Sequence, residues 1–598
     1  MSEKRQRDLR DLLGDCGFED QYLNAGEVLF QEGDPGGTFY LVRGGRLRAV
    51  KGLGTEDARM LGEIGRDESV GEMAVLGETT RSASVVAVRD SRVMKFCGED
   101  IDDLPKTTLV ELMRNLADRL KRTSQESARP GLPSTLAIVP INREVPLEDY
   151  CRHLADSMDE AGKTSDMIGS GDLPEEMRKL LDQEEIGADG MLMWVEDRED
   201  ACDMLFLKAD YELSMWTRRC LRYADAILLL GKAGTDSERG ETEARVEEMQ
   251  QGAACPAVFL VLIQDEQPYG GTAEWLRDRK VVRHFQVRLN SDEDKHRAAR
   301  LMTGTDVSLA LGGGGARGFA HIGMLRAFDE LGIPIDRIGG TSMGGVISAL
   351  HARGMGWKEV RETVRRHFIE EGRLTDYTLP LLSIDTGKRY IGMLERMFGD
   401  LQIEDLPLNF FCISCNLTQA KPVVHRRGSL AKWIGASVSV PGIAPPLVES
   451  GELLVDGGLL NNLPVDVIKG EGAGTVIGVD VSPDTDLRMP VDYFGRPGAM
   501  EVLRSILPFG KRSNGNGDSG DGHGYPTLGN ILYRATCLSS IYQKESLKDL
   551  ADMYIKLPVS QYKMLEWERI DDLVEIGYRV GMEKLRPLAE ARAALEED

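Results

Sequence analysis

The pentapeptide at residues 340–344 constrains the fold of this chain more than any other stretch. It reads Gly340-Thr341-Ser342-Met343-Gly344, the G-x-S-x-G pattern of a sharp turn between a β-strand and an α-helix that lifts the serine hydroxyl clear of the backbone. Glycines flank the serine because the turn is strained and its two elements pass close together, where a Cβ would clash. The pattern predicts an α/β fold around Ser342 with the serine placed as a nucleophile. Three fixed positions are a weak signal alone, so the surrounding sequence must decide whether Ser342 is a nucleophile.

A glycine-rich loop lies upstream of this turn. Residues 307–311 are typical of a short buried strand, residues 312–318 read GGGGARG, and residues 319–331 are typical of an amphipathic helix. A glycine turn before a helix leaves backbone N–H groups unpaired and favours negative charge. The loop lacks the G-x-x-x-x-G-K-[ST] pattern of a nucleotide-binding P-loop. The nearby serine therefore favours an oxyanion hole over a phosphate site.

Ser342 needs a base, and the downstream sequence offers a carboxylate rather than a histidine. An α/β-hydrolase supplies its residues in the order Ser, Asp or Glu, then His, but after Asp456 only His523 remains, within the polar, glycine-rich residues 513–524. A histidine there would be poorly held. Asp456 follows the strand-like residues 452–455 and precedes two glycines, so a Ser-Asp dyad fits better. The alternative is that Asp456 only caps a turn, as Asp-Gly often does.

Together, the glycine loop, the G-T-S-M-G turn and the D-G-G at 456–458 resemble the three signature elements of patatin-like phospholipases, over about residues 305–595. The resemblance implies that Ser342 is the nucleophile, that Asp456 completes a dyad without histidine, and that no metal or cofactor is required for catalysis. It implies hydrolysis of acyl esters in phospholipids or lysophospholipids. His321 and His351 are interpreted as helix residues. The resemblance assigns the oxyanion hole to Gly313, Gly314 and Gly315, and motif support to Arg317, Gly318, Gly340, Gly344 and Gly457.

Length and composition bound the remaining possibilities. A chain of 598 residues is long enough for three or four domains. Its formal charge of −25 argues against a nucleic-acid binder and against wholesale attachment to anionic lipid. It has no run of 18 apolar residues, no signal-peptide pattern, and nine scattered cysteines, which together suggest a cytoplasmic protein. The lipid substrate that the resemblance implies adds an expected peripheral contact with the inner membrane face. Cys412-x-x-Cys415 lacks a second pair, which favours a buried strand over a zinc site.

The sequence at the front of the chain predicts a small β-sandwich or β-barrel. Residues 16–100 alternate short apolar runs with Gly/Pro turns, and residues 101–124 have helical spacing. Residues 70–85 resemble the phosphate-binding cassette of cyclic-nucleotide-binding domains, with departures at Val75 and Thr80. This resemblance makes cAMP or cGMP the candidate regulatory ligand. The nucleotide-site candidates are Gly71, Glu72, Arg81 and Ser82; a carboxylate can accept from a ribose 2′-hydroxyl and a guanidinium can pair with the phosphate. The alternative is a barrel that has lost its ligand.

Between these two ends, the sequence predicts a scaffold. Residues 127–134 have linker composition, residues 136–141, 226–230 and 258–263 read as buried strands, and no catalytic constellation accompanies them. The predicted domains are 1–128 (cyclic-nucleotide-binding-like), 135–300 (α/β scaffold) and 305–595 (patatin-like). Their order, and residues 216–225, resemble neuropathy target esterase and its bacterial relatives. One nucleotide-like domain and no helical anchor suggest the bacterial type.

Two other functions stay open at this point. The chain could be a cyclic-nucleotide sensor or scaffold with little lipase activity, or a soluble carboxylesterase. A lipid substrate requires membrane access, for which residues 379–384 and 506–512 are the candidate apolar contacts. A homo-oligomer is also left open.

Overall fold

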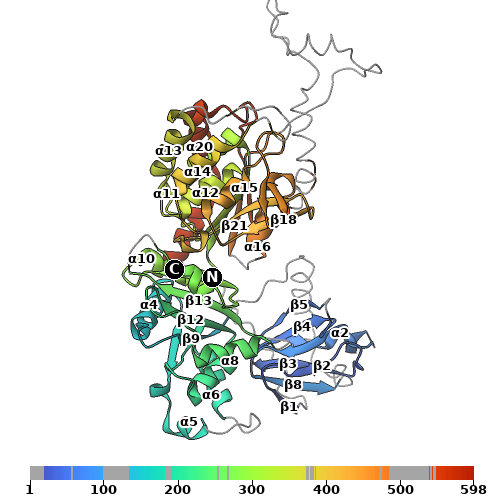
Figure 1. The fold of residues 1–598 in the computed structure, drawn as a ribbon. Coiled ribbons are helices and arrows are strands. Elements are labelled where there is room, and N and C mark those ends of the chain that lie inside the picture. The colour runs from blue at the N-terminus through green and yellow to red at the C-terminus, as the bar shows by residue number, and fades with distance from the viewer. Residues whose placement is uncertain are drawn as a thin grey trace, which may run out of the picture.

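The chain folds into three units, seen in the computed structural model in Figure 1. The structure describes residues 19–597 except 56–57, 78, 98–132, 182–189, 252–254, 266–268, 372–375, 377–382, 384, 471–473, 484–537, 539–541 and 543–546. The predicted helix at 101–124, most of the linker, His523, most of 379–384 and all of 506–512 lie outside the described residues. The predicted fold class is confirmed: a β-barrel-like unit, a middle α/β unit and a C-terminal α/β unit.

The front unit consists of two four-stranded antiparallel sheets packed face to face, ordered β1-β8-β3-β6 and β2-β7-β4-β5. Side chains on the inner faces of the two sheets, among them those of Leu23, Val42 and Val85, form its core. A short helix lies between β6 and β7 and carries the start of the predicted cassette. The elements are β1 (Glu19–Leu23), β2 (Val28–Phe30), β3 (Thr38–Gly44), β4 (Leu47–Lys51), β5 (Arg59–Ile64), β6 (Ser69–Val70), α2 (Glu72–Leu76), β7 (Ser84–Ala87) and β8 (Ser91–Cys97).

The middle unit is a six-stranded parallel sheet in the order β10-β11-β9-β12-β13-β14, covered on both faces. Its strands are continuous apolar runs because neither face meets water. Its strands are β9 (Thr135–Pro140), β10 (Ser165–Gly169), β11 (Met204–Lys208), β12 (Ala226–Lys232), β13 (Ala257–Ile263) and β14 (Arg283–Val287). Its α-helices are α4 (Leu147–Glu160), α5 (Glu175–Leu180), α6 (Gly190–Asp200), α7 (Met215–Tyr223), α8 (Glu241–Gln250), α9 (Thr272–Leu276) and α10 (Asp292–Thr303). The three strands predicted here are confirmed.

The third unit is built on an eight-stranded sheet in the order β19-β20-β17-β16-β15-β21-β22, with β18 also paired to β17. Strands β15, β16, β17, β21 and β22 run parallel, whereas β18 and β20 run antiparallel to β17. The strands are β15 (Val307–Leu311), β16 (Arg337–Thr341), β17 (Asn409–Asn416), β18 (Lys421–His425), β19 (Leu447–Glu449), β20 (Glu452–Asp456), β21 (Thr475–Asp480) and β22 (Met553–Lys556). Cys412 and Cys415 lie buried in β17, as predicted.

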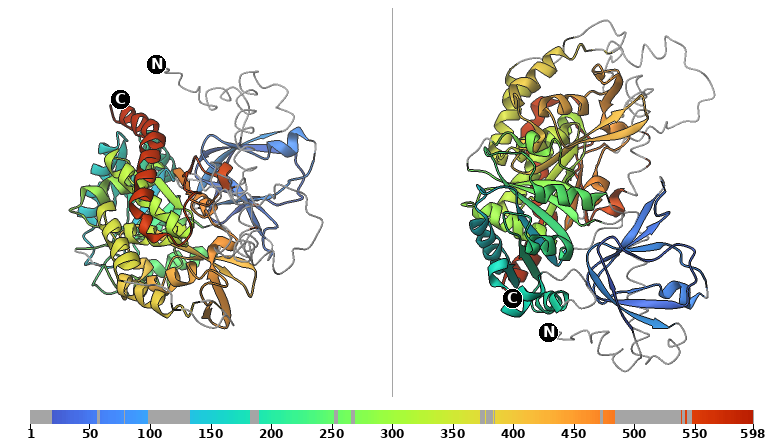
Figure 2. Two further views of the ribbon diagram at one scale, coloured as in Figure 1. Left: turned by 90° about the horizontal axis from the view of Figure 1, so that it is seen from above. Right: turned by 60° about the horizontal axis from the view of Figure 1, so that its bottom comes forward.

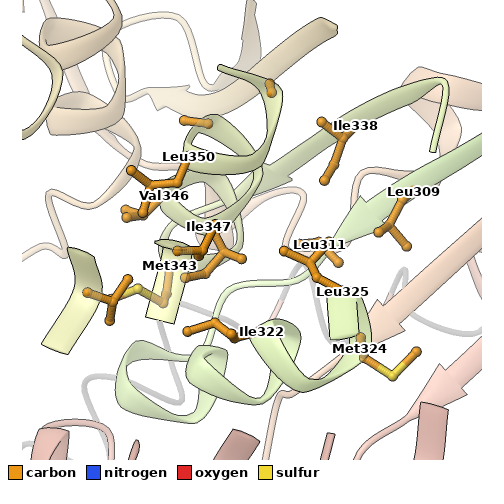
Figure 3. Packing of buried hydrophobic residues seen from close by; sticks show 14 of the residues in the cluster. Leu309, Leu311, Ile322, Met324, Leu325, Ile338, Met343, Val346, Ile347 and Leu350 are labelled. Carbon is orange, nitrogen blue, oxygen red and sulfur yellow. The ribbon is translucent and has the colours of Figure 1, made fainter. Parts of the chain in front are cut away.

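Helices cover the third sheet and hold its first two strands in place. Figure 3 shows side chains of α11 (Ala320–Glu330) and α12 (Met343–Ala352) meeting Leu309 and Leu311 of β15 and Ile338 of β16. Phe319, predicted to begin the helix, instead belongs to a preceding 3₁₀ turn (Gly315–Phe319). The other α-helices are α13 (Trp357–Arg365), α14 (Lys388–Phe398), α15 (Leu430–Ser437), α16 (Val465–Lys469) and α20 (Ile570–Glu597).

Helices α11 and α20 approach each other to backbone contact. A Cβ built on Gly577 would lie 1.8 Å from the carbonyl oxygen of Ala320, and one on Gly323 would lie 1.9 Å from that of Val574. No side chain fits between such backbones, so only glycine is tolerated at these two positions. This contact fixes the C-terminal helix beside the helix that follows the glycine loop.

Buried ion pairs join the front unit to the middle unit, which lie against each other in Figure 2. Asp225, at the start of β12, pairs with Arg46 at 3.1 Å and Arg89 at 2.7 Å, both from turns of the barrel. Its carboxylate also accepts from the backbone N–H of Ser134 at 2.8 Å. Asp225 closes the 216–225 stretch singled out in the sequence, which therefore serves as a joint between the two units.

Among the described residues, the structure contains no helix long and apolar enough to cross a bilayer.

Candidate active site

Ser342 occupies a strained turn between β16 and α12. Its backbone has φ 54° and ψ −127°, in a region that non-glycine residues rarely adopt. The N–H of Ser342 donates to Oγ of Ser437 at 3.0 Å. Ser437 ends α15 and is fully buried. Sequence reasoning did not single out Ser437, since a serine at a helix end carries no special signal.

The glycines beside Ser342 are required by close approach, as predicted. A Cβ on Gly344 would lie 2.2 Å from the carbonyl oxygen of Leu311, and one on Gly340 would lie 2.6 Å from the same oxygen. The first turn of α12 therefore rests directly on the end of β15. Gly318 is equally confined, because its Cβ would lie 2.5 Å from Cγ of Met343.

Asp456 reaches Ser342 from the far side of β17. In the sheet, Thr341 pairs with Ile413 and Asp456 pairs with Ser414, so the ends of β16 and β20 flank one strand. The Ser342 side chain lies within hydrogen-bonding reach of the Asp456 carboxylate. Burial raises the pKa of Asp456 to about 6, against the opposing effect of the hydrogen bonds from Ser342 and the Gly458 N–H. The structure thus brings the two predicted residues together.

Asp456 also caps a turn, which is the alternative interpretation of the D-G-G sequence. Its Oδ1 accepts from the N–H of Gly458 at 2.7 Å. A Cβ on Gly457 would lie 2.5 Å from the carbonyl oxygen of Ile413, which explains why glycine follows the aspartate. The turn fixes the carboxylate in the position from which it meets the serine.

The glycine loop touches the serine. A Cβ on Gly313 would lie 2.9 Å from Cβ of Ser342. The N–H of Gly313 donates to the carbonyl oxygen of Asn462 at 3.2 Å, and its carbonyl accepts from Nδ2 of Asn462 at 3.1 Å. Within the described residues, the N–H groups of Gly314 and Gly315 have no acceptor. Asn462, six residues beyond Asp456, was not predicted to belong to the site.

The C-terminal segment braces the same loop. The N–H of Ala316 donates to the carbonyl oxygen of Met564 at 2.7 Å, and Nε of Arg317 donates to that of Tyr562 at 2.8 Å. Arg317 is buried. Any residue type can offer a main-chain carbonyl, so no sequence signal could have identified these partners.

Two histidines near the site are structural. Nε2 of His321 lies 2.8 Å from the carbonyl oxygen of Gly312, and burial lowers the pKa of His321 to about 4. The ring is therefore neutral near pH 7 and donates its N–H to that carbonyl. Nδ1 of His351 lies 3.1 Å from the carbonyl oxygen of Met355. Both fit the prediction of helix residues without a role as proton carriers.

In the front unit, the structure brings Arg81 against Gly71. Nη1 of Arg81 donates to the carbonyl oxygen of Gly71 at 2.9 Å, and Nη2 donates to that of Thr38 at 2.7 Å. The guanidinium stacks on the Phe30 ring, 4.1 Å from its centroid. Glu72 begins α2 and is buried, whereas Ser82 is exposed. Arg81 thus ties the cassette turn to strand β3.

Three family models match the chain in sequence order. The cyclic nucleotide-binding domain matches residues 20–108, the neuropathy target esterase family P-loop-like domain matches residues 133–310, and the patatin-like phospholipase matches residues 309–469. The third match contains Ser342 and Asp456.

Curated relatives align over nearly the whole chain. Lysophospholipase nte1 of Aspergillus fumigatus is 30% identical over 96% of this chain and 42% of its own length. Patatin-like phospholipase domain-containing protein 6 of Homo sapiens is 29% identical over 94% of this chain and 44% of its own length. The chain therefore spans less than half the length of these relatives.

Among solved structures, the regulatory domain of Toxoplasma gondii PKA with cAMP matches 19% of this chain and 47% of its own, at 18% identity and a TM-score of 0.17, which is too low to carry an argument. The three domains and the curated relatives agree with the geometry of the serine and aspartate. The chain therefore carries, in this order, regions that match a cyclic nucleotide-binding domain, a neuropathy target esterase family P-loop-like domain and a patatin-like phospholipase domain.

Proposed function

We propose that this chain is a serine hydrolase that cleaves acyl esters of lysophospholipids and phospholipids with Ser342 and Asp456. The observation that carries the proposal is that Ser342, held in a strained turn, lies within hydrogen-bonding reach of a buried carboxylate whose pKa is raised by burial to about 6. A base with this pKa is ionised at pH 7 and still takes up a proton readily. The names of the curated relatives support a lipid ester as substrate.

The chemistry follows from the placement of these groups. Asp456 takes the hydroxyl proton as Ser342 Oγ bonds to the ester carbonyl carbon. The tetrahedral intermediate collapses, the ester C–O bond breaks, and the leaving alkoxide takes the proton from Asp456. An acyl-enzyme remains on Ser342. Water, deprotonated by Asp456, then releases the fatty acid and restores the serine. The reaction as proposed draws on no metal or cofactor.

We assign the oxyanion donors to Gly314 and Gly315 rather than to all three predicted glycines. The N–H of Gly313 already donates to Asn462, so its part is to hold the loop against Ser342. The N–H groups of Gly314 and Gly315 have no acceptor within the described residues and open the 3₁₀ turn at Gly315, where unpaired donors favour negative charge.

The direct test measures fatty-acid release from lysophosphatidylcholine micelles and from diacyl phospholipid vesicles. We expect release by the wild type and loss of at least about a thousandfold in Ser342→Ala and Asp456→Asn. Asp549→Asn, an exposed carboxylate of the same unit, serves as the charge-matched control and should keep full activity. No release from the wild type on either substrate would favour a sensor or scaffold. Cleavage of short soluble esters alone would favour a carboxylesterase.

We further propose that cAMP or cGMP binds at Gly71, Glu72, Arg81 and Ser82 and relieves inhibition of the hydrolase. The family match of the front unit supports a cyclic nucleotide as ligand. The test adds each nucleotide to the same assay, with Arg81→Lys as the variant, because lysine keeps the charge but loses the fork that grips a phosphate. A hydrolysis rate that changes with neither nucleotide, together with calorimetry that detects no binding of cAMP or cGMP, would contradict this regulation.

A further inference from the structure

Three exposed apolar side chains form a row at one edge of the third sheet. Leu417 is 44% exposed, Leu453 41% and Val448 63%. Val448 and Leu453 are register partners in the β19–β20 hairpin, and the N–H of Leu417 donates to the carbonyl oxygen of Leu453 at 2.8 Å. The three residues therefore lie side by side on neighbouring segments. We call this row the apolar rim.

The rim extends an apolar face of the sheet beyond the layer that covers it. Side chains alternate along a strand, so Leu417 shares its face with Phe411 and Ile413 of β17. Those two are buried in a cluster with Leu463 and Ile468, next to α16. Further along the strand this cover ends, and the apolar row meets solvent.

The rim lies further along the strands than the dyad and, because side chains alternate, on the other face of the sheet from the Asp456 side chain. Asp456 pairs with Ser414, and Leu453 and Leu417 each lie three positions further along their strands. Three residues of strand span about 10 Å. The offset points past the carboxyl end of β16, where Ser342 sits, and open α/β sheets bind their ligands at this end. Figure 1 shows β18, next to the rim, on the side of the unit opposite α11 and α13.

Charge at the rim suits phosphate. Lys421 pairs with Asn416 in the β17–β18 ladder, is exposed, and forms no ion pair with any described residue. Of the two carboxylates of the β19–β20 hairpin, Glu449 pairs with Lys432 at 2.6 Å, whereas Glu452 accepts from Asn416 Nδ2 at 2.6 Å and keeps its charge. In a chain of net charge −25, a lysine left beside exposed apolar side chains is a local exception that favours lipid headgroups.

We propose that the apolar rim inserts into a lipid surface, with Lys421 at the headgroup level, and so brings the acyl ester to Ser342. The inference rests on the proposed hydrolase function. It assigns membrane contact to the β17–β18 turn and the β19–β20 hairpin. A side chain that enters the interface leaves water, so polar replacement weakens binding without touching the dyad.

The test compares sedimentation with vesicles of phosphatidylcholine and phosphatidylglycerol for the wild type and for Val448→Ser/Leu453→Ser. We expect the double variant to lose binding by about tenfold or more. Val282→Ser is the matched control, because Val282 is 65% exposed in the middle unit, and it should bind as the wild type does. Hydrolysis of a short-chain soluble ester should stay unchanged in both variants, which also shows that they fold.

Other outcomes separate this inference from the proposed function. Equal vesicle binding by the double variant and the wild type would overturn the proposal that the apolar rim inserts into lipid, even if lipid is hydrolysed. If the Ser342→Ala variant still binds vesicles through the apolar rim, the proposed membrane contact is supported, even if no variant hydrolyses lipid. β19 is also the outer strand of the described sheet, so a second copy could pair there. A dimer in analytical ultracentrifugation that the double variant dissociates, with vesicle binding retained, would overturn the lipid assignment.

Discussion

Replacing the buried Asp456 carboxylate should stabilise the protein while abolishing its activity. The pKa of this carboxyl rises from 3.8 to about 6 on folding, chiefly through burial. Each factor of ten corresponds to about 1.36 kcal/mol, so the ionised form costs the folded state roughly 3 kcal/mol. Asparagine has nearly the same shape, can still accept from the N–H of Gly458, and carries no charge. Asp456→Asn removes this cost.

The sign of the pH dependence follows from the direction of the shift. The folded state holds its proton more tightly than the unfolded state, so this group stabilises the fold fully below about pH 4, and that stability is lost as pH rises through about 6. The advantage of the Asp456→Asn variant over the wild type should therefore be near zero at pH 4, grow up to about pH 6 and level off above it. All other titrating groups cancel in the comparison.

The assay is calorimetric unfolding of both proteins at several pH values from 4 to 8, following the transition of the patatin domain. For a domain of this size, about 3 kcal/mol corresponds to a rise in Tm of roughly 6–12 °C above pH 6. Ser342→Ala is the control, because it also abolishes activity but keeps the carboxylate, and it should show no pH-dependent gain. An Asp456→Asn variant no more stable than the wild type at pH 7.5 would refute the reasoning.

Four further perturbations test other parts of the structure. If Asp456 is the base, kcat/KM on an uncharged ester should rise with pH around a midpoint of about 6; a flat profile from pH 5 to 8 would exclude it. Gly344→Ala places a Cβ 2.2 Å from a β15 carbonyl and should cost about 3 kcal/mol or more in unfolding free energy, whereas Gly356→Ala, in open space, should not destabilise the fold. Ser437→Ala removes the acceptor for the nucleophile's amide and should lower kcat about tenfold at constant KM, with Ser437→Thr restoring it; equal losses in both would mean misfolding. Asp225→Asn leaves two buried arginines of the front unit without their shared carboxylate and should destabilise the chain by about 3–5 kcal/mol in thermal unfolding; an unchanged Tm would show that the joint contributes little.

The parts of the site that the sequence predicts are those where local geometry limits the residue type. Only glycine fits where Gly340 and Gly344 touch β15, and the nucleophile proposed at Ser342 needs a hydroxyl. Both requirements limit the residue types at these positions, so the motif can be recognised in the sequence. The same holds for Asp456, which needs a carboxylate and a following glycine. The strands β9, β12 and β13 of the middle unit were predicted for another reason, since buried parallel strands are continuous apolar runs.

The partners that complete the site leave little trace in a single sequence. Met564 contributes a main-chain carbonyl, which any residue would supply. Asn462 and Ser437 use ordinary polar side chains, and their importance depends on which distant segment lies opposite. The pairing of Asp225 with Arg46 and Arg89 joins two units, so neither unit's own pattern reveals it.

The contact between the glycine loop and the C-terminal segment can form only late in synthesis of the chain. Arg317 meets Tyr562 across 245 positions of chain. At about 5–20 residues per second, a ribosome needs roughly 12–50 s to make that stretch. The front and middle units can fold in this interval, whereas the loop beside Ser342 lacks its support until the last tenth of the chain emerges. During this interval a nascent chain therefore contains Ser342 beside a glycine loop that still lacks the support of the C-terminal segment.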